Sequence, residues 1–167
     1  IKKEEVRISP FDHGYLYGLG LFETFRVYKG HCFLLDDHLK RLNDSLETLN
    51  INLKFERNEI EGKVKRLLAA NGYDDAYIRL NVSAGNGEIG LQTNPYTQPV
   101  IIIFSKPLPP SSPLVEKEAV LLSIPRNTPE GPERLKSHHY LNNLFAKREI
   151  GDDPNKEGVF LTGEGYL

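Results

Sequence analysis

The stretch Leu21-Phe-Glu-Thr-Phe-Arg-Val-Tyr-Lys-Gly-His31 sets the first elements of the fold. It begins with residues typical of strands, and Tyr28-Lys-Gly-His31 has the composition of a hairpin turn. The pattern predicts a strand from Leu21 to Tyr28 and a return strand from His31 to Leu35. The segment before it, residues 9–20, carries one proline and three glycines and predicts irregular backbone.

Two helices are predicted next. Asp36 or Asp37 can cap the first helix, which carries Arg41 on its first turns. In the second, Asn58 with Glu61 three residues later indicates a capping box, and Gly72 marks the end. Apolar residues follow helical spacing in both, at Leu39, Leu42, Leu46 and Leu49, and then at Ile60, Val64, Leu67 and Leu68.

Two strands follow the helices. Tyr77 to Ser83 alternates, with Ile78, Leu80 and Val82 on one face and a polar second face that could line a site. Val100 to Phe104 is wholly apolar, which predicts a strand covered on both faces.

A proline-rich stretch predicts a domain boundary, because Lys106 to Pro113 holds four prolines in eight residues. The expected division is an α/β domain over 1–106, a linker over 107–114, and the first part of a second domain over 115–167. The second part should contain a strand at Ala119 to Ile124, a helix near Tyr140 to Glu149, and a hairpin beginning at Gly158.

Composition narrows the function classes. The chain is 39% hydrophobic and 26% charged, as expected of a globular protein, and has no apolar run long enough to span a membrane. A net charge of −2 without a basic cluster argues against nucleic acid as a partner. Cys32 is the single cysteine, which excludes an internal disulfide; it reads as a half-buried strand residue, and no metal site is expected. We expect a soluble, cytoplasmic protein.

Lys136 and Arg41 are the residues most suited to chemistry. A lysine that forms a Schiff base needs burial or cationic neighbours so that it is neutral part of the time, and Arg134, His138 and His139 lie close to Lys136 in sequence. Arg41 could bind a phosphate dianion from its helix. Taken alone, surface roles are favoured for both residues: Lys136 as a solvated lysine, and Arg41 as the partner of Asp37 or Asp44.

Five segments, read in order, resemble the fold-type IV pyridoxal-phosphate enzymes, which include branched-chain and D-amino-acid aminotransferases and aminodeoxychorismate lyases. The matching segments are Asp12-His-Gly-Tyr-Leu-Tyr-Gly18, Gly20-Leu-Phe-Glu-Thr-Phe-Arg26, His38-Leu-Lys-Arg-Leu42, Tyr77-Ile-Arg79 and Arg134-Leu-Lys-Ser137. The resemblance implies an α+β fold of the aminotransferase type, with a small two-layer α/β domain followed by the start of a larger cofactor-binding domain.

The resemblance also implies roles for individual residues. Lys136 matches the lysine that forms the Schiff base with pyridoxal 5′-phosphate, and Arg41 matches the arginine that binds the cofactor phosphate. Phe22, Tyr77 and Arg79 match positions on the substrate side of the pocket, with Arg79 as a carboxylate anchor. Tyr17 matches a residue that reaches the neighbouring subunit's site in some relatives. The family is typically a homodimer.

Within the family, residues 126–149 look most like the bacterial aminodeoxychorismate lyases. In that interpretation Lys136 removes a ring proton from 4-amino-4-deoxychorismate, and 4-aminobenzoate and pyruvate are the products. The chain lacks an initiator Met and stops at Leu167 within the expected hairpin, so we expect it to be a piece of a longer protein. Relatives supply the partner of the pyridine nitrogen after that point, and the isolated 167 residues should therefore bind cofactor poorly and be inactive.

Two alternatives stay open from the sequence. An aminotransferase for D-amino or branched-chain amino acids could use the same scaffold, because the two chemistries diverge late. A non-catalytic domain could also have kept the scaffold, although the presence of both Lys136 and Arg41 favours an enzyme.

Overall fold

A computed structural model describes residues 1–109 and 114–167 of the chain. The expected linker falls partly on residues 110–113, which lie outside the described residues. The chain divides into two compact units. The first contains Ile1–Pro109 together with Lys136–His138, and the second contains Pro110–Leu135 and His139–Leu167.

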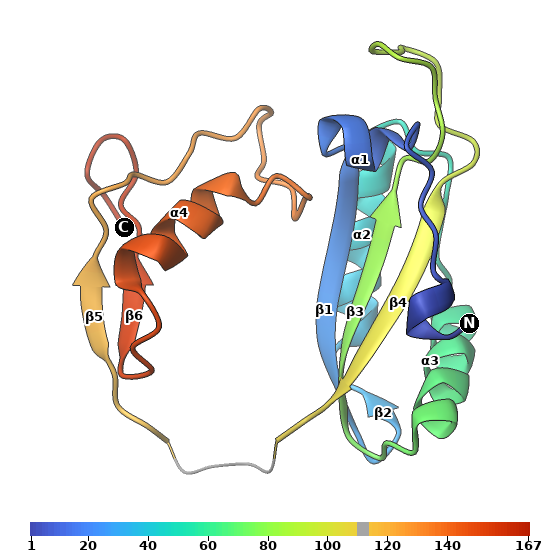
Figure 1. Cartoon of the computed structure of the whole chain (residues 1–167), viewed down its shortest axis with the longest axis horizontal. Helices are drawn as coiled ribbons and strands as arrows, with labels where there is room; N and C mark the ends of the chain where they lie inside the picture. Colours follow the sequence, from blue (N-terminus) through green and yellow to red (C-terminus); the bar gives the residue numbers. More distant parts are fainter. Residues whose placement is uncertain (110–113) are drawn as a thin grey trace. The chain divides into compact units, whose positions relative to one another are not determined.

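The first unit is built on a four-stranded antiparallel sheet with the strand order β2-β1-β3-β4 (Figure 1). Its strands are β1 (Gly20–Tyr28), β2 (His31–Cys32), β3 (Ala76–Ser83) and β4 (Val100–Pro107). The hairpin between β1 and β2 is present, but the return strand is shorter than predicted. It ends at Cys32, because Leu34 adopts a left-handed conformation and the next helix begins at Leu35.

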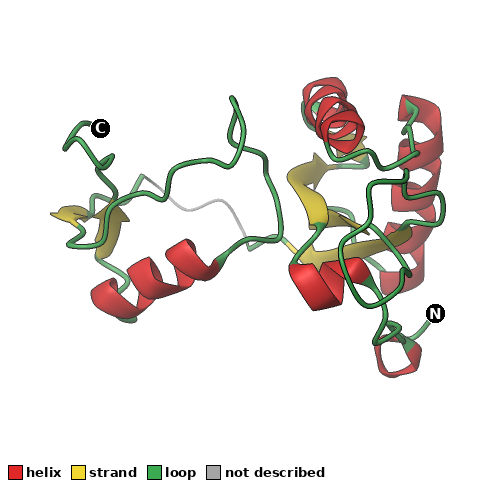
Figure 2. Cartoon of the chain, turned by 90° about the horizontal axis from the view of Figure 1, so that it is seen from above, coloured by secondary structure: helices red, strands yellow, loops and turns green. Residues whose placement is uncertain are grey.

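Two long helices cover one face of this sheet, as Figures 1 and 2 show: α2 (Leu35–Thr48) and α3 (Arg57–Asn71). The predicted periodicity is confirmed, since Leu39, Leu42 and Leu46 of α2 are buried, as are Ile60, Val64 and Leu68 of α3. The alternation in β3 is confirmed too. Ile78, Leu80 and Val82 are fully buried under the helices, and the residues between them are half-buried on the open face.

The predicted helix starts are wrong in detail. The N-cap of α2 is Leu34 and that of α3 is Glu56, and neither side chain makes a capping hydrogen bond. Asp36 and Asp37 lie inside the first turn of α2, where their charge still suits the positive end of the helix dipole. Gly72 does end α3, with a left-handed φ of 67°.

The prediction for β4 is also wrong. Within the described part of the chain this strand pairs with β3 alone and forms an edge of the sheet, and its residues are not covered on both faces. Phe104 keeps 50% of its surface exposed. An apolar run therefore did not indicate burial on both faces here, because burial depends on what packs against the strand.

Two short elements precede β1: a 3-10 helix η1 (Lys3–Glu5) and α1 (His13–Tyr17). Asp12 caps α1, accepting hydrogen bonds from the N–H groups of Gly14 and Tyr15. Its second carboxylate oxygen accepts a hydrogen bond from the Ser83 hydroxyl at 2.7 Å. This buried carboxylate attaches α1 to the end of β3.

The second unit contains β5 (Glu118–Leu121), α4 (Leu141–Ile150) and β6 (Lys156–Val159). The predicted strand and helix are present within a few residues of their expected bounds. β5 and β6 pair in parallel, and α4 lies between them in the sequence. Of the hairpin expected from Gly158, the described residues contain a first strand, β6, and a turn. In the turn the Thr162 N–H donates to the Tyr166 carbonyl. None of the described helices is long and apolar enough to cross a membrane.

Candidate active site

The segment Lys136–His138 adds to the edge of β1 in the first unit. The N–H of Phe22 donates to the carbonyl of Lys136 at 3.0 Å, and the N–H of His138 donates to the carbonyl of Gly20 at 2.9 Å. This edge is accessible because β2 pairs with β1 only at Val27 and Tyr28. Strand pairing thus fixes the backbone of the expected Schiff-base lysine against the first unit.

Gly20 permits this close approach. A Cβ at this position would lie 2.3 Å from the His138 ring, far inside van der Waals contact. Any side chain here would push the segment away from β1. The glycine at the start of the strand therefore has a steric role in placing Lys136.

The ring of Phe22 is the centre of the candidate site. Its side chain is buried, and the Lys136 ammonium lies 4.7 Å from the ring centroid. The Arg79 guanidinium carbon lies 3.7 Å from the same centroid, and the His138 ring packs nearly parallel to it at 6.4 Å. Cations near an aromatic face are attracted by the ring quadrupole. The structure thus brings together three of the residues that the resemblance selected: Phe22, Arg79 and Lys136.

Arg79 is held by Asn81, two residues further along β3. Its Nε donates to the Asn81 Oδ1 at 3.2 Å, and both residues lie on the open face of the sheet. A hollow of about 190 Å³ lies beside Asn81, and its lining also includes Ser83 and His138. The open face therefore offers polar groups and space beside the segment that carries Lys136.

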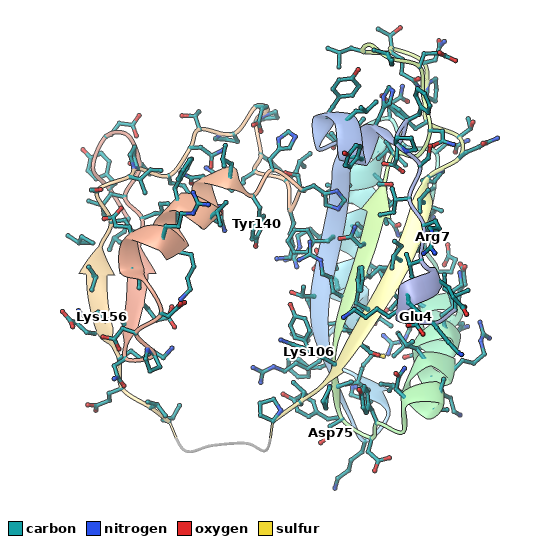
Figure 3. All side chains as sticks on the ribbon, in the orientation of Figure 1. Glu4, Arg7, Asp75, Lys106, Tyr140 and Lys156 are labelled. Atoms are coloured by element: carbon teal, nitrogen blue, oxygen red, sulfur yellow. The ribbon has the colours of Figure 1, made fainter. Side chains whose placement is uncertain are left out.

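Tyr77 and Tyr17 lie outside this group. Tyr77 shares the open face of β3, but its ring is covered by Lys106 of β4, whose Nζ lies 4.7 Å from the ring centroid; Lys106 is labelled in Figure 3. The Tyr17 hydroxyl accepts a hydrogen bond from the Gly90 N–H at 2.6 Å. The structure thus places Tyr17 with the long loop that follows β3.

Arg41 is bound to a carboxylate that sequence reasoning overlooked. Its Nε and Nη2 donate to the two oxygens of Glu23, at 2.6 and 2.7 Å. This bidentate bond raises the pKa of Arg41 and keeps the guanidinium charged. Of the suggested partners, Asp44 is wrong, since it pairs with Lys40 instead. The charge of Asp37 does contribute to the raised pKa of Arg41, after the hydrogen bond to Glu23. Glu23 follows Phe22 in β1, so its side chain lies on the opposite, helix-covered face.

Two buried polar residues were missed in the sequence. Glu23 sits among Leu21, Phe25 and Val27 on the apolar face of β1, and an acid at such a position was a usable signal. His13 is 1% exposed; its Nε2 donates to the Glu88 carbonyl at 2.8 Å, and its Nδ1 lies 2.7 Å from the Tyr96 hydroxyl. Its partners are far away in sequence, so no local pattern could identify them.

Cys32 is buried more fully than expected, with 3% of its surface exposed. Burial raises the pKa of its thiol, which disfavours the reactive thiolate. Among the described residues, no group of three or more histidine, cysteine and acidic side chains could hold a metal ion.

Comparison with known proteins gives the family. The family model of amino-transferase class IV matches residues 20–167, and the chain belongs to this family. It is 49% identical over 169 residues to the aminodeoxychorismate lyase of Bacillus subtilis, covering 100% of this chain and 58% of that protein. The expected α+β fold of the aminotransferase type is thereby confirmed.

Solved structures agree with this assignment. The 4-amino-4-deoxychorismate lyase from Pseudomonas aeruginosa superimposes with a TM-score of 0.71 at 26% identity, over 95% of this chain and 58% of that one. The branched-chain aminotransferase from the thermophilic archaeon Thermoproteus uzoniensis, solved with norvaline, gives 0.81 at 26% identity, over 98% and 57%. The chain therefore spans rather more than half the length of these relatives.

Proposed function

We propose that the protein is a pyridoxal 5′-phosphate-dependent 4-amino-4-deoxychorismate lyase, which forms 4-aminobenzoate and pyruvate for folate biosynthesis. The observation that carries the proposal is the arrangement at the edge of β1, where Lys136 and Arg79 both lie against Phe22. The 49% identity to the Bacillus subtilis lyase, over the whole chain, supports this choice of reaction.

The donor groups of the first unit suit the two reactive ends of this cofactor. Lys136 offers a primary amine for an aldehyde, beside an aromatic ring and a guanidinium. The Arg41 side chain is 54% exposed. Its N–H groups other than the two bound to Glu23 can still donate hydrogen bonds to a phosphate. Bound pyridoxal phosphate supplies an aldehyde that takes up amines and a ring that accepts electrons.

Each residue then has a distinct task. Lys136 would hold the cofactor through its amine and would be the base that takes the proton from ring carbon 4 of the substrate. Arg79 pairs with a substrate carboxylate, for which a guanidinium provides two parallel N–H donors. Phe22 supports both side chains through the contacts with its ring. The resemblance adds Tyr77 and Tyr17 to the substrate pocket, Tyr17 by way of a homodimer.

An aminotransferase is the second candidate. It is favoured by the likeness to the Thermoproteus uzoniensis branched-chain aminotransferase, whose structure holds the amino acid norvaline. Both enzymes would use Lys136, and they differ in whether a bond of the substrate side chain is broken after the proton is removed. A cytoplasmic location, with small molecules rather than nucleic acid or membrane as partners, fits either reaction.

Product analysis of the full-length protein separates the two. Incubation with 4-amino-4-deoxychorismate should give 4-aminobenzoate and pyruvate in equal amounts, and Lys136→Ala should abolish both. Amino-group exchange with a 2-oxo acid, without an aromatic product, would overturn the lyase in favour of the aminotransferase. A yellow protein from which borohydride fixes the cofactor on Lys136 tests the attachment independently of the reaction.

A further inference from the structure

Glu23 is an acidic residue buried in the protein interior, where a carboxylate without partners would be destabilising. It is 1% exposed and lies in the middle of β1, among apolar residues that face the helices. A buried carboxylate is tolerated only when charged or hydrogen-bonding partners satisfy it. Its two partners both come from α2, at the positions of His38 and Arg41.

The contacts of Glu23 use both oxygens. Oε1 accepts from the Nε of Arg41, and Oε2 accepts from both the Nη2 of Arg41 and the Nδ1 of His38, the latter at 2.8 Å. A carboxylate only accepts, so Nδ1 of His38 carries the proton. The 3.3 Å approach between Arg41 Nη2 and His38 Nδ1 then joins two donors and is not a hydrogen bond.

This geometry restricts Arg41 in a useful way. The guanidinium is gripped along its Nε–Nη2 side by a carboxylate that cannot itself move, because β1 and α2 bury it. Nη1 takes no part in that grip, and the side chain remains half exposed. A long, flexible side chain is thereby restricted to one orientation while about half of its surface stays exposed. Ordering it in advance removes an entropic cost that anion binding would otherwise carry.

We propose that Glu23 is a positioning residue that orients Arg41 to bind the cofactor phosphate, with His38 completing the carboxylate's hydrogen bonds. The inference rests on the proposed function, since it takes Arg41 as the phosphate ligand. The new element is that Glu23 contributes to the specificity for a phosphorylated cofactor without contacting the phosphate. Glu23 carries negative charge and cannot bind the phosphate itself, so its effect acts through Arg41.

The test compares pyridoxal 5′-phosphate with pyridoxal, which lacks the phosphate, as ligands of the full-length apoprotein. Glu23→Gln keeps the shape but replaces one acceptor with a donor that opposes an N–H group of its partners. We expect the preference for the phosphorylated ligand to fall about tenfold, with little change in pyridoxal affinity. Arg41→Gln should lower the same preference by about tenfold or more. Asp44→Asn, an exposed acid on α2, is the matched control and should leave the preference unchanged.

The outcomes separate the two claims. If Arg41→Gln lowers the preference and Glu23→Gln does not, the positioning role of Glu23 is overturned while the phosphate ligand stands. If Arg41→Gln also leaves the preference unchanged, Arg41 is not the phosphate ligand and both claims fail. Should Glu23→Gln fail to fold, Glu23→Asp is used: it keeps the charge but shortens the reach to Arg41, and an unchanged preference there would equally overturn the proposal.

Discussion

Phe22 and Lys136 are joined at two levels. The backbone N–H of Phe22 donates to the Lys136 carbonyl at 3.0 Å, and the Lys136 ammonium lies 4.7 Å from the centroid of the Phe22 ring. The strand edge therefore sets the position of the lysine backbone, and the ring provides a surface for its amine. Changes to either contact should alter how Lys136 is presented.

Gly20→Ala should displace the segment that carries Lys136. The added Cβ would lie 2.3 Å from the His138 ring and 2.7 Å from the Val82 carbonyl oxygen, and the β-sheet carbonyl cannot give way. We expect a loss of about 1–3 kcal/mol in the free energy of unfolding, as for other overpacked sites. Borohydride fixation of cofactor on Lys136 should also fall. Full stability together with normal fixation would contradict the steric role of Gly20.

Gly62→Ala is the matched control for that substitution, and it predicts a change of opposite sign. Gly62 lies within α3, and an added Cβ would meet no atom within 4 Å. Alanine is the better helix former, so the free energy of unfolding should rise by about 0.5–1 kcal/mol. Denaturant unfolding of the two variants, measured side by side, checks both signs.

Phe22→Leu should weaken the site more than its effect on stability explains. Leucine keeps apolar bulk but removes the π face that Arg79 and Lys136 share. We expect cofactor affinity to fall about threefold to tenfold, which corresponds to roughly 0.6–1.4 kcal/mol for the two cation–π contacts together. Phe55→Leu changes an equally buried ring in the segment between α2 and α3. If both variants lose affinity equally, the effect belongs to the core and not to the site.

Tyr96→Phe should loosen the loop over residues 84–99. The Tyr96 hydroxyl donates to Nδ1 of His13, because Nε2 of His13 is the nitrogen that donates to the Glu88 carbonyl. Burial raises the pKa of Tyr96, which keeps the hydroxyl protonated for this bond. We expect a cost of about 0.5–1.5 kcal/mol and faster amide hydrogen exchange in the loop. Tyr15→Phe, an exposed tyrosine on α1, should change neither quantity.

The stability of the second unit should depend on pH through Glu149. Hydrogen bonds from Ser123, of which that from its backbone N–H is 2.6 Å long, lower the pKa of this carboxyl below its ordinary value of 4.5. The unfolded chain then binds the proton more tightly, so this stabilisation is complete above pH 4.5 and is lost as pH falls through the native pKa. The stability difference between the protein and Glu149→Gln should shrink over that window. A difference that stays constant down to low pH would contradict the assignment.

The helices and the central strand were predictable from the sequence because their signals are local. Apolar spacing identified α2 and α3, and alternation identified the buried face of β3. In each case the period of the apolar residues identifies both the type of element and the face that is buried. Membership of the family was likewise indicated by five short segments in a fixed order, and the comparisons confirmed it.

Features that depend on distant partners were not predictable in this way. The edge position of β4 follows from its single pairing with β3, and the parallel pairing of β5 with β6 follows from the path of α4 between them. The capping predictions failed because Leu34 and Glu56, at the starts of their helices, carry no capping side-chain bond.

For the candidate site, the residue types could be read from the amino-acid sequence: a lysine, two arginines and an aromatic ring in segments typical of the family. That Lys136 adds to the edge of β1 beside Phe22, and that Glu23 of β1 holds Arg41, follows from the tertiary packing. The physical reason is that hydrogen bonds and ion pairs act over a few ångströms in space. Which residues come within that range depends on how strands and helices pack, and it cannot be inferred from their separation along the chain.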